Sequence, residues 1–144
     1  MRMEIQYGLL VLAVLLSLWR GGQPERTGVA IMVGALLADR LFHALLRGSI
    51  YHEVDVWHLL LDGAMLAGII ALALSANRKW PMWLAALQVI ATMSHALRAI
   101  DTEMLNIVYP VLSRAPFYPQ LGVLIIACLL ANRTRRARGV SDTL

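Results

Sequence analysis

Residues 56–76 read VWHLLLDGAMLAGIIALALSA, an apolar run in which His58 and Asp62 are the only ionisable side chains. A membrane-spanning helix needs about 20 predominantly apolar residues, within a range of about 17 to 25. The run therefore predicts a membrane helix that carries two side chains poorly solvated by hydrocarbon.

The rest of the chain has the same apolar character. Of its 144 residues, 59% are hydrophobic and 15% are charged, and the mean hydropathy is +0.65. Four further apolar segments lie at 5–19, 28–46, 80–100 and 117–131, although the first and last reach full span length only with their polar flanks. We expect an all-α, polytopic membrane helix bundle with about five transmembrane helices, forming a single domain over residues 1–144.

The segment between the fourth and fifth apolar runs, DTEMLNIVYPVLSRAP at 101–116, has a mixed character. Pro110 and Pro116 would break a helix here before it could cross a membrane. We expect this segment to form a short interfacial helix.

Basic residues predict the orientation of the bundle. With five crossings, one side receives eight basic residues against Glu25 and Asp142, namely Arg20, Arg26, Arg78, Lys79, Arg133, Arg135, Arg136 and Arg138. Because positive residues are retained on the cytoplasmic side, we expect a bacterial-type inner (plasma) membrane protein with its N-terminus outside. The basic tail 133–144 would then be cytoplasmic.

Topology also accounts for the sequence pI of about 9.8. No nucleic-acid-binding motif accompanies the basic residues, so we expect no nucleic acid partner. The expected partners are membrane lipid and either other membrane subunits or a second copy of the chain. Four arginines in the tail leave binding to anionic lipid headgroups open.

Polar stripes on three of the predicted helices meet in the outer half of the bundle. Asp39 and His43 are four residues apart, as are His58 and Asp62, while His95 falls at a comparable depth on the fourth helix. Such stripes should face one another, because each group would otherwise lack a partner in hydrocarbon. The predicted buried network consists of Asp39, Arg40, His43, His58, Asp62, His95, Arg98 and Asp101.

A purely structural role is one interpretation of this network. Asp39 would pair with Arg40 or Arg98, and Asp62 with His58 or Arg98, which links helices without a ligand. The protein would then be a small accessory, structural or binding subunit of a larger membrane complex. No catalytic residue is identifiable from the sequence, which favours a non-enzymatic role.

Cofactor binding is the alternative interpretation. His43, His58 and His95, with Asp39 or Asp62, offer nitrogen and oxygen ligands suited to a divalent transition metal such as Zn²⁺, Fe²⁺ or Mn²⁺, and an open coordination position could support hydrolysis. His43 and His95 could instead be the two axial ligands of haem b, with redox activity. The single Cys128 argues against disulfides and thiolate metal clusters.

Overall fold

The computed structural model describes the backbone of residues 2–45, 51–100, 111 and 115–141, and the side chains of residues 4–45, 56–95, 97, 111 and 115–131. Within this part of the chain it has five helices, which are α1 (Arg2–Trp19), α2 (Gln23–Leu45), α3 (Tyr51–Ser75), α4 (Trp80–Ile100) and α6 (Phe117–Ser141). These described ranges contain no strand, so the all-α prediction is confirmed.

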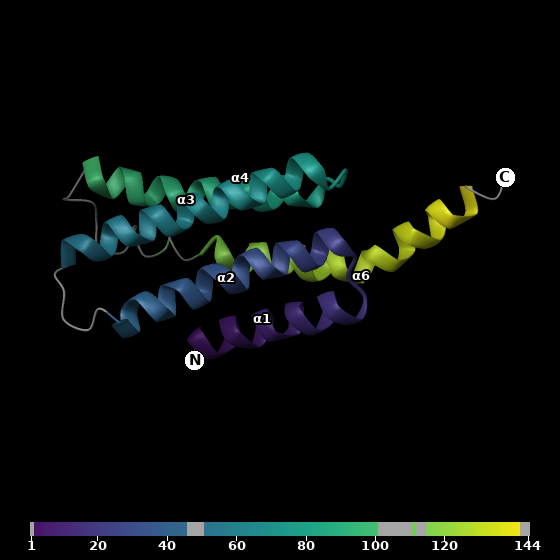
Figure 1. Ribbon diagram of the computed structural model, residues 1–144, viewed down its shortest axis with the longest axis horizontal. Coiled ribbons are helices and arrows are strands. Elements are labelled where there is room, and N and C mark those ends of the chain that lie inside the picture. Colours follow the sequence, from purple (N-terminus) through teal and green to yellow (C-terminus); the bar gives the residue numbers. More distant parts are fainter. Residues whose placement is uncertain (1, 46–50, 101–110, 112–114, 142–144) are drawn as a thin grey trace.

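The helices lie side by side along the long axis of the molecule (Figure 1). Helices α1, α3 and α6 run in one direction, while α2 and α4 run in the other. Helix α3 packs against α2 and α4, and α6 packs against α1, α2 and α4. The end of α2, the start of α3 and the end of α4 therefore meet at one end of the bundle.

All five described helices contribute to one apolar core. Its fully buried members include Met32, Ile69, Leu84, Leu121 and Leu124. Residues Leu10, Ala13, Val29 and Met65 complete the buried cluster. Burial of side chains of this size stabilises the bundle by about 1.5–3 kcal/mol each relative to exposure in water.

Two helices are long and apolar enough to cross a membrane, namely α2 and the Val56–Ser75 part of α3. Their mean hydropathies reach 1.6 and 1.8, yet only 17% of the residues in either apolar window are buried within the protein. A core helix of a soluble protein would be mostly buried. Shorter apolar stretches lie in α1 and α6, at Glu4–Trp19 and Phe117–Ala131.

Some boundaries differ from those predicted. Helix α2 starts at Gln23 instead of residue 28, and α6 continues to Ser141, through most of the basic tail. Polar residues and arginines are acceptable helix formers, so hydropathy alone underestimates these lengths. The predicted interfacial helix at 101–116 falls almost entirely outside the described residues.

The turn between α1 and α2 is fixed by hydrogen bonds. Gly21 N–H donates to the carbonyl oxygens of Leu16 and Ser17, each at 3.1 Å. The Arg26 guanidinium then donates to the carbonyl oxygens of Ser17 (3.3 Å) and Leu18 (3.1 Å). A cation at the C-terminal end of α1 also favours its helix dipole.

Gly21→Ala should destabilise the protein, because a Cβ there would lie 2.5 Å from the carbonyl oxygen of Ser17 and force the backbone to move. We expect the free energy of unfolding, measured by denaturation in detergent micelles, to fall by about 1–3 kcal/mol. Gly8→Ala in α1 is the control, since a Cβ at Gly8 meets nothing within 4 Å. Equal losses in the two variants would contradict this account of the turn.

Candidate functional site

Three helices bring acidic residues and histidines to the same end of the bundle. Asp39 and His43 come from α2, His58 and Asp62 from α3, and His95 from α4. This convergence follows from the antiparallel arrangement, because α2 and α4 end where α3 begins (Figure 1). Two connected groups result, which we call the triad (Asp39, His43 and His58) and the amide chain (His95, Asp62, Gln88 and Gln120).

The triad is built around the carboxylate of Asp39. Its Oδ1 lies 3.2 Å from Nε2 of His58 and 3.4 Å from Nδ1 of His43. One potential ligand atom from each residue can be chosen so that all three lie within 4.8 Å of one another. The side chains are 28% (Asp39), 46% (His43) and 32% (His58) exposed, so the triad lies at the surface of the helix bundle.

A backbone contact orients His43 within the triad. Its Nδ1 lies 2.8 Å from the carbonyl oxygen of Asp39, so the tautomer protonated at Nδ1 donates a hydrogen bond there. The lone pair of Nε2 then stays available. Histidine ligands of metal ions are commonly fixed in this way, with the second ring nitrogen donating to a carbonyl or carboxylate oxygen.

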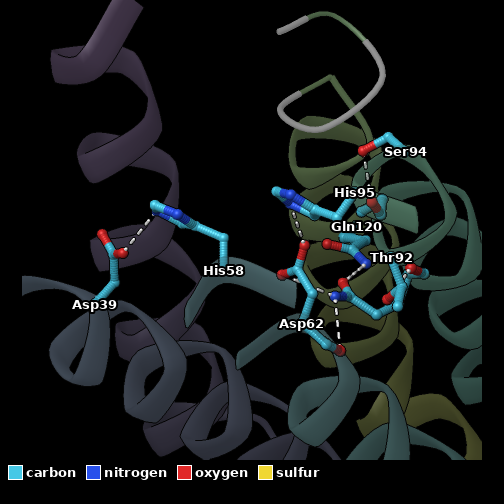
Figure 2. A network of polar contacts seen from close by, with 9 residues as sticks. Asp39, His58, Asp62, Thr92, Ser94, His95 and Gln120 are labelled. Carbon is cyan, nitrogen blue, oxygen red and sulfur yellow. Dashed lines mark hydrogen bonds and ion pairs between the residues drawn. The ribbon is translucent and has the colours of Figure 1, made fainter. Parts of the chain in front are cut away.

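The amide chain lies deeper and joins three helices (Figure 2). His95 Nε2 lies 3.1 Å from Oδ2 of Asp62, and the His95 side chain is only 7% exposed. Gln88 Nε2 donates to Oδ1 of Asp62 at 3.2 Å. Gln120 Nε2, from α6, donates in turn to Oε1 of Gln88 at 2.8 Å. The buried polar groups of α3, α4 and α6 thus satisfy one another.

Imidazole contacts connect the triad to the amide chain. The rings of His58 and His95 are nearly parallel, with 4° between their planes and 5.9 Å between centroids. His58 also lies 5.4 Å from the ring of His43, at an angle of 50°. Three imidazoles and two carboxylates therefore form one cluster with an accessible part and a buried part.

Several predicted partners are placed differently. Arg40 is exposed, and its guanidinium lies over the ring of Tyr7, 5.3 Å from the centroid, instead of pairing with Asp39. His58 contacts Asp39, whereas His58 was predicted as one of two alternative partners of Asp62, with Arg98 as the other. The side chain of Arg98 and the whole of Asp101 lie outside the described residues.

Gln120 is a member that sequence reasoning missed. Its side chain is 1% exposed. The only feature of the sequence that could have indicated its membership is a single amide side chain near the start of an apolar segment. Gln88 is also absent from the predicted network. The hydroxyl of Ser94, which precedes His95 in the sequence, donates to the Ala91 carbonyl oxygen of its own helix at 2.6 Å.

The arrangement can bind a cation or hold a proton between carboxylate and imidazole. Comparisons with protein-family models, with curated proteins and with solved structures find no match for this chain. The chemistry of the side chains themselves therefore has to carry any functional assignment.

Gln88→Leu should lower the free energy of unfolding by about 1–2 kcal/mol, because it leaves buried groups of Gln120 and Asp62 without their partner. Thr92→Val is the matched control in α4, since the Thr92 hydroxyl donates only within its own helix, to the Gln88 carbonyl oxygen at 3.0 Å. The double variant Gln88→Leu/Gln120→Leu should cost less than the sum of the two single changes. Strict additivity would mean that the two amides do not interact.

Proposed function

We propose that the protein is a multi-pass inner-membrane protein that binds a divalent transition-metal ion at the triad. The membrane part of this proposal is supported by the large apolar side chains on the outside of the bundle. Leu74 is 84% exposed, Trp19 76% and Leu45 73%, and these side chains recur around the helices. Water solvates such a surface poorly, whereas the hydrocarbon interior of a membrane solvates it well.

The metal part rests on one observation, namely that a carboxylate and two imidazoles from α2 and α3 offer ligand atoms within 4.8 Å of one another. Two ligand atoms bound to one tetrahedral Zn²⁺ ion are about 3.3 Å apart, given bonds of about 2.0–2.2 Å. The separation of Asp39 Oδ1 from His58 Nε2 is similar, at 3.2 Å, and His43 would complete the set through its available Nε2. Two histidines and one carboxylate suit Zn²⁺, Fe²⁺ or Mn²⁺ and leave coordination positions open.

The amide chain would contribute to metal binding at the triad through its negative charge. Because Asp62 is already bonded to His95 and Gln88, it is positioned as a fixed negative charge rather than as a ligand. A negative charge near a bound cation strengthens its binding.

Haem b fits the cluster less well. His58 contacts the rings of both proposed axial ligands, His43 and His95, so an imidazole occupies space that the macrocycle would need. Two carboxylates also adjoin that space, which disfavours an apolar macrocycle.

A structural network in an accessory subunit remains the competing function, and one observation favours it. The four members of the amide chain satisfy one another without any ligand, as a purely structural network would. If the protein has that function, the triad should also be a structural network that binds no metal ion. Metal titration separates the two.

Purified full-length protein in detergent should bind Zn²⁺ in isothermal titration calorimetry and give a Co²⁺ absorption spectrum typical of nitrogen and oxygen ligands. Asp39→Asn and His58→Gln should each weaken binding by more than about tenfold, because each removes a ligand. Glu25→Gln, at the other end of the bundle, is the control and should bind normally. Absence of binding by the unmodified protein, or normal binding by the double variant Asp39→Asn/His58→Gln, would favour the structural network.

Membrane orientation can be tested with single cysteines in a Cys128→Ala background. Gln23→Cys and Ala44→Cys lie on exposed positions near the two ends of α2. In intact cells a membrane-impermeant thiol reagent should label Ala44→Cys, whereas Gln23→Cys should react only after the membrane is permeabilised. Labelling of both from one side would contradict a spanning α2.

A further inference from the structure

A second polar site lies at the opposite end of the bundle from the triad. A cavity of about 450 Å³ opens between the start of α2, the connection from α3 to α4 with the first turn of α4, and residues 123–130 of α6. Its polar lining comes from Glu25, Arg78, Lys79 and Trp80, and its apolar lining includes Ile126 and Leu130 of α6. Charged and apolar walls thus lie side by side.

Glu25 is the unusual member of this lining. Its side chain is only 1% exposed, and its Oε2 accepts a hydrogen bond from Gly22 N–H at 2.8 Å, which caps the start of α2. Its second oxygen, Oε1, is buried without a hydrogen-bond partner. A buried carboxylate oxygen without a donor is costly, so this position favours a ligand that supplies one.

The other polar groups that line the cavity favour a negatively charged group on the ligand. The described part of the chain gives the side chains of Arg78 and Lys79 no hydrogen bond or ion pair. The indole Nε1–H of Trp80 is also buried without a partner. Two cations and a free N–H donor together suit a phosphate group.

The apolar wall indicates what the phosphate is attached to. Ile126 is 57% exposed and Leu130 46%, so this wall continues onto the outer surface of α6. A long acyl chain could follow it out of the cavity. Trp83, which is 68% exposed at the same site, is typical of a residue at a membrane interface.

We propose that this cavity binds a phospholipid whose headgroup carries a primary ammonium, as phosphatidylethanolamine does. The ammonium donates to Glu25 Oε1, the phosphodiester accepts from Arg78, Lys79 and Trp80, and an acyl chain covers Ile126 and Leu130. The proposal rests on the membrane location proposed above, but not on the metal site. An anionic headgroup such as that of phosphatidylglycerol offers Glu25 only neutral hydroxyl donors, and a choline headgroup has no N–H to donate.

Native mass spectrometry of the full chain in detergent can test the preference, with phosphatidylethanolamine, phosphatidylcholine and phosphatidylglycerol of identical acyl chains. We expect phosphatidylethanolamine to be retained about tenfold more strongly than the other two, as one additional charged hydrogen bond would provide. Glu25→Gln should abolish that preference, while the amide oxygen of Gln can still accept from Gly22 N–H. Arg78→Ala/Lys79→Ala should weaken all three lipids together.

Two controls make the outcomes decisive. Asp39→Asn should lose Zn²⁺ and keep the lipid preference, so that failure at one site is distinguishable from failure at the other. Water-soluble glycerophosphoethanolamine should bind far more weakly than the lipid, and comparable binding would identify a small zwitterion as the ligand instead. Equal retention of the three lipids would indicate annular lipid only and overturn the proposal, as would an unchanged preference in Glu25→Gln.

Discussion

Asp39 and Asp62 each reach across a helix boundary to an imidazole, and the packing of the bundle has to accommodate both contacts. Asp39 connects α2 to α3 through His58, and Asp62 connects α3 to α4 through His95. Apolar side chains alone would tolerate many rotations of one helix about its axis, because most of the surface of each helix is similar. A carboxylate that needs a hydrogen-bond donor is compatible with few such rotations. These two contacts therefore fix how α2, α3 and α4 are rotated about their axes.

The general fold and the location of the cluster were accessible from the sequence, since apolar run length and helical periodicity carry that information. Spacings of three and four residues place side chains on a common face but leave the neighbouring helix and its axial position undetermined. The partner of each carboxylate could therefore not be predicted from the sequence. Arg40 is an example. Adjacent side chains on a helix point about 100° apart, so the Arg40 side chain points away from Asp39 and contacts the ring of Tyr7 on α1. Gln120 was missed because nothing local shows which helix its amide will meet.

The two ends of the bundle combine charge and exposure differently. At one end, carboxylates and imidazoles face one another, and a cation would complete the accessible part. At the other, the buried carboxylate of Glu25 adjoins Arg78 and Lys79 beside an apolar wall, which suits a ligand of both charges. The core between them, around Met32, Ile69 and Leu84, is apolar and fully buried. Such a core keeps the two sites apart, so that substitutions at one share no contact with residues at the other and their effects on stability should be additive.

The hydrogen bond from Gln120 to Gln88 has a consequence for biogenesis. Its two residues are 32 positions apart, and the donor belongs to α6, which is synthesised after the other four described helices. Until α6 packs against the bundle, the Gln88 amide oxygen on the α3–α4 hairpin lacks the donor that it has in the complete structure. Docking of α6 both removes this polar defect and covers the apolar core. A chain truncated before residue 120 would therefore lack both the donor to Gln88 and the part of the core that α6 contributes.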